Sequence, residues 1–250
     1  MKAIQAMIYP IISIITVVYN ARPTLEETIK SVLSQKKDLV EYWIIDGGST
    51  DGSIELILKY EQQLAGWISE PDNGIYDAMN KGIDRARGQW IYFLGGDDTL
   101  RPDIISQIQP HLYDSYSMIF GEVRFDNGYL YRSFLGLRTL LQNTVHHQSV
   151  FYNATLFENY RYDPSLTIVS EYDIHLRLYT EKQPTLRIPT IIADCATGGA
   201  SSDLPRSLKE TNRVRGRYVN NKLKHKFLSA FLRLYYAQKR LRYFLYGHQI

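Results

Sequence analysis

Two adjacent carboxylates, Asp97 and Asp98, directly follow an apolar run at residues 90–94 and a pair of glycines. An aromatic and apolar run of this kind is typical of a central strand, and glycines let the backbone turn sharply at the strand's carboxyl end. Ligands of open α/β sheets bind at that edge, and carboxylate oxygens suit hard divalent cations such as Mg²⁺ or Mn²⁺. The pair therefore predicts a metal site, although Gly-Gly-Asp-Asp by itself is also a common solvated turn.

Three further polar segments stand where strands are expected to end, at residues 16–20, 46–51 and 70–74. A dinucleotide-binding fold would place Gly-x-Gly-x-x-Gly after the first strand, but the chain has Asn-Ala-Arg-Pro there, and it contains no P-loop. A cation that bridges phosphate oxygens is the remaining way to hold a nucleoside diphosphate. The polar segments therefore predict a site for a charged, phosphate-bearing substrate.

The elements that position these loops alternate between β-rich apolar runs and helical periodicity up to about residue 112, which predicts a mostly parallel sheet flanked by helices. Strands are expected at residues 11–18, 42–45, 67–68 and 90–94. The first helix is expected to begin with a capping box at Thr24, and another helix spans about residues 75–85. The residues expected to face inward on the three helices are Leu25, Ile29, Val32 and Leu33, then Ile54, Ile57 and Leu58, then Ile75, Met79 and Ile83.

The second half of the chain predicts a mixed sheet. Runs at 118–125 and 129–134 are separated by Asp-Asn-Gly, a strong hairpin signal, and a helix at 171–181 and a strand at 186–194 follow. We expect one domain over residues 1–204, with two halves at 10–112 and 113–204. Residues 205–250 form a basic helical tail.

Composition limits where the chain works. Its 250 residues, 44% of them hydrophobic, suffice for one large domain with an appendage. Cys195 is the only cysteine, so no intrachain disulfide can form, which favours a reducing compartment such as the cytoplasm. The apolar run at 4–18 contains Pro10 and no cleavage motif, which favours a buried strand over a signal peptide. No run is long enough for a membrane-spanning helix.

Charge is distributed unevenly. From Arg206 onward the chain carries twelve Lys and Arg residues against one acid, Glu210, whereas the remainder has a net charge of −8. The tail mixes these cations with Leu, Phe and Tyr, so it is consistent with a helix on anionic lipid, a helix on nucleic acid, or a helix packed on the body. Nothing in the body resembles a nucleic-acid-binding module, so an anionic membrane surface is the expected partner and nucleic acid is not.

The ordered segments 13–20, 45–52, 69–82 and 93–98 resemble the motifs of family 2 glycosyltransferases, and in particular a bacterial polysaccharide subgroup that includes colanic acid and O-antigen enzymes. The resemblance covers roughly residues 10–200 and implies that residues 10–112 form the nucleotide-sugar-binding half and residues 113–204 the acceptor-side half. It implies a GT-A fold, a nucleoside diphosphate sugar donor, a divalent metal cofactor (Mn or Mg), and inversion at the anomeric carbon.

Carried over residue by residue, the resemblance implies a donor-binding set and a metal site. The donor-binding residues would be Thr16, Tyr19, Asn20, Asp46, Asp77, Asn80 and Lys81. Asp97 aligns with the last, metal-binding acid of the family's Asp-x-Asp motif, and Asp98 would support it. Three positions depart from the family: Gly47 replaces an acid that often contacts the base, Met79 replaces a common arginine, and Gly95 replaces the first metal-motif acid.

An inverting transferase also needs a base for the acceptor hydroxyl. The resemblance places Glu171 in that position, with Asp173 as the alternative, although acids at a helix start also simply stabilise the helix dipole. His147 and the glycines Gly198 and Gly199 resemble acceptor-side segments of the subgroup. The His146-His147 pair could equally be packed side chains, because no third histidine gives it zinc-like spacing.

The expected protein is therefore a metal-dependent inverting glycosyltransferase that uses a UDP-sugar to extend a lipid-linked glycan in cell-surface polysaccharide biosynthesis. We expect it in the cytoplasm, peripheral at the inner face of the plasma membrane. Two alternatives remain: transfer directly onto polyprenyl phosphate, and a catalytically silent protein that binds membrane or nucleic acid through its basic tail.

Overall fold

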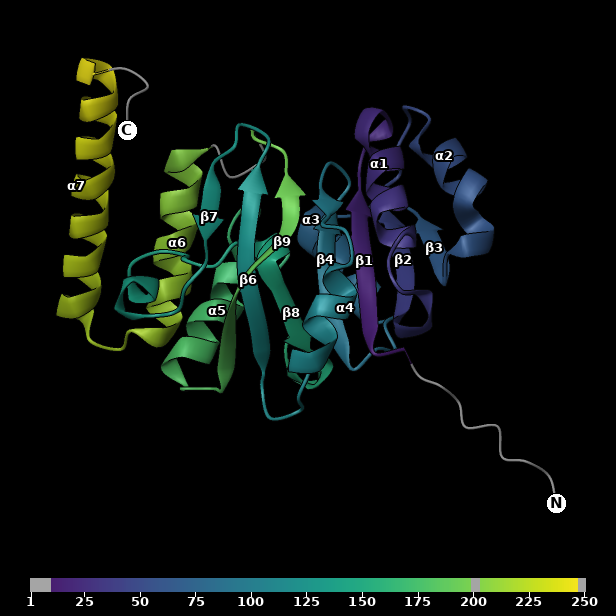
Figure 1. Ribbon diagram of the computed structural model, residues 1–250. Coiled ribbons are helices and arrows are strands. Elements are labelled where there is room, and N and C mark those ends of the chain that lie inside the picture. The colour runs from purple at the N-terminus through teal and green to yellow at the C-terminus, as the bar shows by residue number, and fades with distance from the viewer. Residues whose placement is uncertain (1–9, 199–202, 247–250) are drawn as a thin grey trace.

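A single mixed sheet organises the chain (Figure 1). The computed structural model describes residues 10–198 and 203–246, and within these residues nine strands form one sheet in the order β3-β2-β1-β4-β8-β6-β9-β5, with β7 paired to β6. The strands are β1 (Ile12–Val18), β2 (Val40–Asp46), β3 (Gly66–Ser69), β4 (Trp90–Gly95), β5 (Thr99–Leu100), β6 (Met118–Phe125), β7 (Leu130–Arg132), β8 (Val150–Asn153) and β9 (Thr185–Cys195). The predicted mostly parallel sheet flanked by helices is confirmed.

Strand direction brings six strand ends to one edge of the sheet. The first four strands pair in parallel. Strand β8 runs antiparallel to both β4 and β6, so β6 regains the direction of β4, and β9 pairs parallel with β6. The carboxyl ends of β1, β2, β3, β4, β6 and β9 therefore share one edge, at the top of Figure 1.

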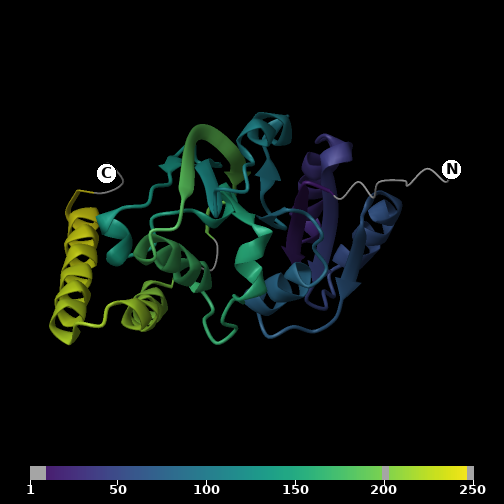
Figure 2. The same cartoon turned by 90° about the horizontal axis from the view of Figure 1, so that it is seen from below.

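Helices cover both faces of the sheet (Figure 2). Their bounds are α1 (Arg22–Leu33), α2 (Ser53–Tyr60), α3 (Ile75–Ile83), α4 (Ile104–Ile108), α5 (Ser170–Thr180), α6 (Leu204–Tyr218) and α7 (Lys222–Tyr246). Short 3-10 helices lie at Lys37–Leu39, Glu61–Gln63, Gln109–His111, Leu137–Leu140, His147–Ser149 and Ala154–Glu158. Alternate strand residues feed two cores: Ile14 and Tyr92 pack with α1, α2 and α4, while Ile15 and Phe93 pack with α3 and α5.

Three predictions about the helices were wrong. Helix α1 begins at Arg22 rather than with a capping box at Thr24, because Pro23 suits the first turn and the Thr24 hydroxyl instead donates to the carbonyl of Gly96 at 2.8 Å. Helix α2 begins at Ser53, so its period turns Leu56 and Ile57 inward and leaves Leu58 45% exposed. Ile75 is likewise 45% exposed, because it opens α3, whose buried stripe begins one residue later.

The basic C-terminal segment forms two helices, and the first is built into the body. Val214 of α6 packs with Tyr172 and Leu176 of α5. The carboxylate of Glu210 accepts hydrogen bonds from the backbone N–H groups of residues 167, 168 and 169, at 3.0, 2.9 and 3.3 Å, just before α5 begins. The predicted division at residue 205 thus falls inside α6, whereas α7 lies at the outer edge, farthest from β3 (Figure 1). None of the helices in the described residues is long and apolar enough to cross a membrane.

Candidate active site

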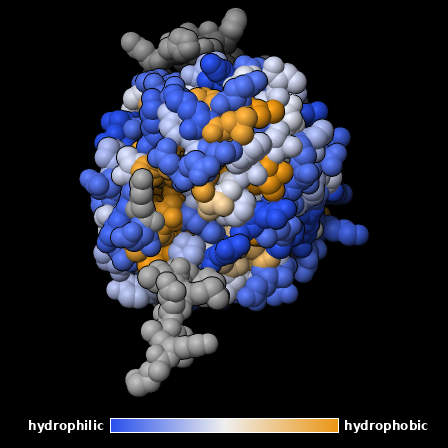
Figure 3. Space-filling view, turned by 90° about the vertical axis from the view of Figure 1, so that its right-hand side faces the viewer, coloured by the Kyte–Doolittle hydropathy of each residue, from blue (hydrophilic) through white to orange (hydrophobic). Residues whose placement is uncertain are grey.

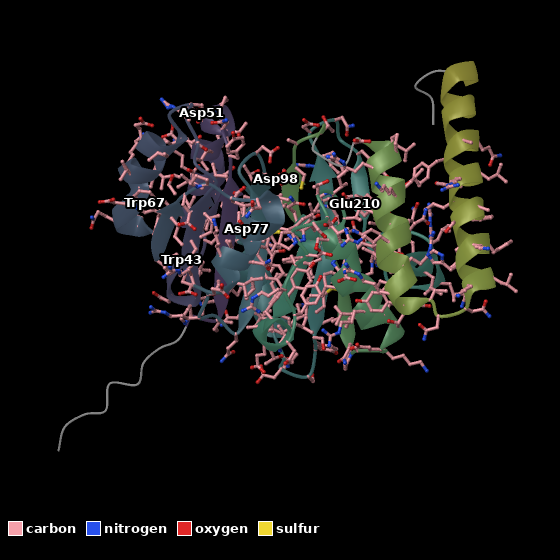
Figure 4. The ribbon with its side chains drawn as sticks, turned by 180° about the vertical axis from the view of Figure 1, so that it is seen from behind. Trp43, Asp51, Trp67, Asp77, Asp98 and Glu210 are labelled. Carbon is pink, nitrogen blue, oxygen red and sulfur yellow. The ribbon has the colours of Figure 1, made fainter. Side chains whose placement is uncertain are left out.

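The parallel register aligns the polar loops along one edge. Val18 lies opposite Asp46, Asp46 lies opposite Ser69, and Gly95 lies opposite Val17. The four segments that the sequence singled out therefore meet at the carboxyl ends of β1 to β4. Asp98 lies where these strands meet the second half of the sheet (Figure 4).

Asp46 organises the donor-side loops from within. Its buried carboxylate accepts hydrogen bonds from the backbone N–H groups of Gly48 and Ser49, both at 3.0 Å. It also accepts from the hydroxyls of Ser49 and Ser69, at 2.5 and 2.7 Å. Four donors saturate the carboxylate, so Asp46 holds the loop after β2 closed and ties it to the end of β3.

The loop after β1 is fastened to the same structure. Asn20 has a left-handed backbone with φ of 51°, and its N–H donates to the Ser49 hydroxyl at 2.7 Å while its side-chain oxygen accepts from Thr50 N at 2.9 Å. Tyr19 is 68% exposed at this edge. Thr16, in contrast, is fully buried two residues inside β1, and its hydroxyl is hydrogen-bonded to Tyr42 at 3.0 Å. The structure thus brings Tyr19 and Asn20 to the edge and leaves Thr16 in the core.

At Gly47 the side chain that the family commonly carries would have to displace the Asp72 carboxylate. A Cβ atom on Gly47 would lie 2.4 Å from Oδ2 of Asp72, far inside van der Waals contact. The other oxygen of Asp72 accepts a hydrogen bond from Gly74 N at 2.8 Å, which fixes the carboxylate in this position. The Asp72 carboxylate therefore occupies the space in which an acid at position 47 would place its own side chain.

Lys81 and Asp77, both on α3, hold the loop of residues 70–74 in place. The Lys81 ammonium lies 2.9 Å from Glu70 and donates to the carbonyl of Pro71 at 3.1 Å. Asp77 accepts a hydrogen bond from Asn73 N at 3.0 Å. Both predicted donor-binding side chains are thus engaged in positioning the loop of residues 70–74.

Asn80 joins the two halves of the chain. Its amide donates to the carbonyl of Tyr162 at 2.9 Å and accepts from the N–H of Tyr162 at 3.0 Å. This pair of hydrogen bonds satisfies the polar backbone of a segment that leads into α5. Asn80 therefore places the region of Glu171 beside α3.

The two acids after β4 differ in exposure but converge on the same space. Asp97 is exposed, while Asp98 is buried and accepts a hydrogen bond from Ala196 N at 3.0 Å. A Cβ atom on Gly95 would lie 2.8 Å from an oxygen of each carboxylate, so the missing side chain makes room for both. Burial, followed by the charge of Asp97, raises the pKa of Asp98 to about 7.

This carboxylate pair fits a divalent cation that arrives with its substrate. Among the residues that the structure describes, no cluster of three His, Cys, Asp or Glu side chains could enclose a metal ion. Mg²⁺ sites commonly use only one or two carboxylates and complete their coordination with phosphate oxygens and water. A bound cation would also offset the repulsion from Asp97, which adds to burial in raising the pKa of Asp98.

The two candidate bases point in different directions from the first turn of α5. Glu171 accepts a short hydrogen bond from the hydroxyl of Tyr76 on α3, and a second from the Asn143 amide at 3.4 Å. Burial raises the pKa of Glu171 to about 7, against the lowering effect of the Tyr76 hydrogen bond. Asp173 is buried and paired with Arg217 of α6 at 2.8 Å. Positions i and i+2 lie on different faces of a helix, which separates the two carboxylates.

The predicted acceptor-side residues are not all at the edge. The His147 ring stacks on Phe93 of β4 at 5.3 Å, its nitrogens are buried with no hydrogen-bond partner among the described residues, and burial lowers its pKa to about 3. Gly198, with φ of 93°, follows Thr197, whose N–H and hydroxyl both donate to Asp126 at 3.2 Å at the end of β6. Gly199 lies outside the described residues.

Sequence reasoning missed Tyr76, Asn143 and Asp72. Tyr76 and Asp72 lie within the motif of residues 69–82, so their neighbourhood was recognised but not their contacts. Asn143 carries no local signal, because the residue it contacts is 28 positions away in the chain.

Residues 13–177 match the family model described as Glycosyl transferase family 2. The chain belongs to this family. Among its relatives is a PGL/p-HBAD biosynthesis glycosyltransferase of Mycobacterium bovis, 28% identical over 183 residues that cover 70% of this chain and 72% of the relative. An uncharacterized glycosyltransferase of Mycobacterium tuberculosis is 31% identical over 208 residues, which cover 77% and 78% of the two chains.

Solved structures of this fold include S. aureus TarS 1–349 in complex with UDP, which superposes with a TM-score of 0.68 at 15% identity and covers 88% of this chain and 70% of that one. A mannosyltransferase from Pyrobaculum calidifontis, in complex with GDP-Man and Mn²⁺, gives a TM-score of 0.58 at 14% identity and covers 84% and 62% of the two chains. These likenesses establish the GT-A fold of the glycosyltransferase.

Replacing Asp98 with asparagine removes a buried charge and keeps its shape. Because the folded pKa of about 7 lies above the unfolded value, the contribution of Asp98 to stability is largest at low pH and is lost as the pH rises to about 7. We expect Asp98→Asn to stabilise the metal-free protein by roughly 1–4 kcal/mol at pH 8 and by much less near pH 4. Denaturant unfolding at both pH values measures the difference.

The control for this prediction is Asp114→Asn, which removes an exposed carboxylate far from the pair. It should change the free energy of unfolding by less than about 0.5 kcal/mol at either pH. An Asp98→Asn protein that is no more stable than wild type at pH 8 would contradict the buried, repelled carboxylate.

Proposed function

We propose that this glycosyltransferase moves a sugar, with inversion, from a UDP-sugar to a lipid-linked glycan in the biosynthesis of a cell-surface polysaccharide. The observation that carries the proposal is the half-buried Glu171 carboxylate, hydrogen-bonded to Tyr76 of α3 beside the edge at which the donor loops and the Asp97–Asp98 pair gather. The names of the relatives support the pathway, because one acts in PGL/p-HBAD biosynthesis and another, TuaG of Bacillus subtilis, putatively in teichuronic acid biosynthesis. UDP and UDP-GlcNAc bound to TarS support the donor.

In the proposed reaction the acceptor oxygen attacks the anomeric carbon from the side opposite the diphosphate. The new carbon–oxygen bond forms as the bond to the diphosphate breaks, and the nucleoside diphosphate leaves with the electron pair. Glu171 takes the proton of the acceptor hydroxyl, and its pKa of about 7 suits a general base near neutral pH. Asp173 is the poorer base, because its carboxylate is already paired with Arg217.

Asp97 and Asp98 would hold the divalent cation, Mn²⁺ or Mg²⁺, with the exposed Asp97 as the main ligand. When bound, the cation offsets the negative charge that develops on the leaving diphosphate.

Asp72 is our candidate for the acid that reads the donor base. Its carboxylate fills the space beside Gly47, where other family members carry the acid that often contacts the base. Neighbouring carboxylates are occupied, since Asp46 is saturated by four donors and Glu70 is paired with Lys81. A carboxylate at this edge accepts the imide N–H of uracil, which favours a UDP-sugar.

Lipid-linked acceptors require contact with a membrane, and α7 supplies a surface suited to it. One face of α7 is attached to the body through His225, Ser229 and the buried Leu232. The other face exposes an apolar stripe at helical spacing: Leu223 (79% exposed), Phe227 (68%), Phe231 (49%) and Leu234 (69%). The face of the molecule that carries α2 and β3 shows hydrophobic side chains only in separate patches (Figure 3).

Cations flank this apolar stripe. Lys222, Lys224, Lys226 and Arg233 are all exposed on the same helix. Each cation near an anionic bilayer contributes roughly 1 kcal/mol, and buried aromatic and aliphatic side chains add to the binding. We therefore place the protein at the cytoplasmic face of the plasma membrane, with the outer face of α7 on anionic lipid.

Glu171→Gln tests the catalytic assignment. The amide keeps the size of the side chain but cannot take a proton, so kcat should fall at least about 100-fold while UDP affinity measured by calorimetry is retained. Asp97→Ala should instead weaken the binding of UDP with Mn²⁺. Glu181→Gln, at the exposed end of the same helix, is the matched control and should leave transfer unchanged. Full activity of the Glu171 and Asp97 variants would reject the assignment.

Moving the carboxylate from position 72 to position 47 tests whether Asp72 binds the nucleotide base of the donor. Asp72→Ala should weaken UDP binding by roughly 10- to 100-fold, the worth of a hydrogen bond to a charged group. Gly47→Asp alone should also weaken binding, because the two carboxylates would collide. The double variant should regain much of the wild-type affinity in calorimetry, since the carboxylate returns to the same place. A double variant no better than Asp72→Ala alone would show that Asp72 does not read the base.

Vesicle co-sedimentation tests the membrane surface. The double variant Phe227→Ser with Leu234→Ser should bind phosphatidylglycerol vesicles at least about fivefold more weakly than wild type, because it removes exposed apolar area from the stripe. Tyr113→Ser, which removes an equally exposed aromatic ring elsewhere, should bind like wild type. Equal binding of the wild type to phosphatidylcholine and phosphatidylglycerol vesicles would contradict an anionic docking surface.

A further inference from the structure

The proposed base is held by side chains from several elements. Oε2 of Glu171 accepts from the hydroxyl of Tyr76 on α3, and Oε1 accepts from the Asn143 amide at 3.4 Å. Behind Asn143 the hydrogen bonds continue: its side-chain oxygen meets Nδ1 of His175 at 3.0 Å, and Nε2 of His175 meets the hydroxyl of Tyr152 at 2.7 Å. Each carboxylate oxygen thus has one donor within a network that runs from the half-buried Glu171 to the buried His175 and Tyr152.

The donor and acceptor groups of the side chains fix the direction of these hydrogen bonds. A side-chain amide oxygen only accepts, so Nδ1 of His175 must carry the proton that it gives to Asn143. Burial lowers the pKa of His175 well below its ordinary value, so the ring is neutral, and Nε2 must accept from the Tyr152 hydroxyl. The Asn143 amide nitrogen is then turned toward Glu171. Every donor in the chain points toward the carboxylate, and aligned hydrogen bonds of this kind reinforce one another.

Tyr76 approaches the carboxylate from the donor side. It lies in the first turn of α3, two residues after Gly74, whose N–H is bonded to Asp72. The Tyr76 ring is buried and packs against Tyr162 with ring centroids 5.7 Å apart. One hydroxyl therefore links the loop that we assign to the donor with the base that we assign to the acceptor.

We propose that Tyr76 and the Asn143–His175–Tyr152 chain are positioning residues that orient the Glu171 carboxylate toward the acceptor hydroxyl and stabilise its ionised form. This inference rests on the proposed role of Glu171. The two fixed donors occupy one lone pair on each oxygen, which leaves a lone pair free to receive the acceptor proton.

Among Glu171 and the titratable groups that face it, only Glu171 is expected to change its protonation state near neutral pH. Those facing it are Tyr76 from α3, Tyr152 from β8, Tyr160 and Tyr162 from the segment before α5, His175 from α5 itself, and Glu210 from α6. Burial raises the pKa of all four tyrosines and lowers that of His175, so these five groups stay neutral. The charge of Glu210 acts in the same direction as burial and raises the pKa of Glu171.

Tyr76→Phe, compared with Tyr162→Phe, tests the proposal. Loss of the Tyr76 hydroxyl removes a donor that lowers the pKa of Glu171, so the acid limb of the kcat/KM profile should move to higher pH by about one unit. The two donors to the Glu171 carboxylate are Tyr76 and Asn143, and Tyr162 is not one of them, so Tyr162→Phe should leave that limb in place. Asn143→Ala should shift the limb in the same direction as Tyr76→Phe.

The measurement uses the full-length protein at saturating Mn²⁺ with UDP-sugar as the varied substrate, and melting temperatures confirm that each variant is folded. If Glu171→Gln abolishes transfer while Tyr76→Phe and Tyr162→Phe give identical profiles, the positioning role is wrong and the proposed function stands. If Glu171→Gln transfers sugar normally, the base assignment fails, and the positioning proposal fails with it. A shifted limb for Tyr76→Phe alone among the two tyrosine variants supports the proposal.

Discussion

The donor side of the site depends on one buried carboxylate. Asp46 ends β2 and accepts four hydrogen bonds from its own loop and from Ser69, so the ends of β2 and β3 share a single electrostatic centre. Asn20 then fastens the loop of β1 to Ser49 and Thr50, which this centre has already fixed. The exposed side chains at the edge are thereby presented on a rigid framework, and preorganised polar groups of this kind do not have to be ordered again when a charged ligand binds.

The edge could be predicted from the sequence because it depends on local patterns. Apolar runs mark β1 to β4, parallel strands must end on the same side, and the polar loops that follow them are visible in the letters. The pattern did not distinguish Thr16 from Tyr19. Every residue of β1 is buried, so Thr16 lies in the core, whereas Tyr19 lies beyond the end of the strand and is exposed. The surroundings of Glu171 were harder to predict from the sequence. Tyr76 is separated from Glu171 by 95 positions, and only the tertiary structure reveals that the two are hydrogen-bonded.

At two glycines the chain lacks an acid of the family's motifs, and a carboxylate from another residue occupies the same space. At Gly47 and at Gly95 the family commonly carries an acid, and in both places a neighbouring carboxylate enters the space that the missing side chain leaves. Asp72 does so from the next loop, and Asp97 and Asp98 do so from the same turn. A carboxylate is thus present at each place, although the residue at the motif position itself is glycine. A motif search that requires the letters would score this chain as defective, whereas the spatial arrangement of carboxylates remains.

The hydrogen bonds that Glu210 accepts from the residues before α5 limit how the enzyme can be altered. Its carboxylate binds the three N–H groups that precede α5, and Glu171 follows two residues after the last of them. The helix that bears the proposed base is therefore anchored from the C-terminal segment, whose next helix carries the apolar stripe. If α7 binds lipid as proposed, a force on α7 would pass through α6 into the start of α5. Chimeras that exchange the C-terminal helices must therefore keep this one carboxylate, or they will change the position of Glu171.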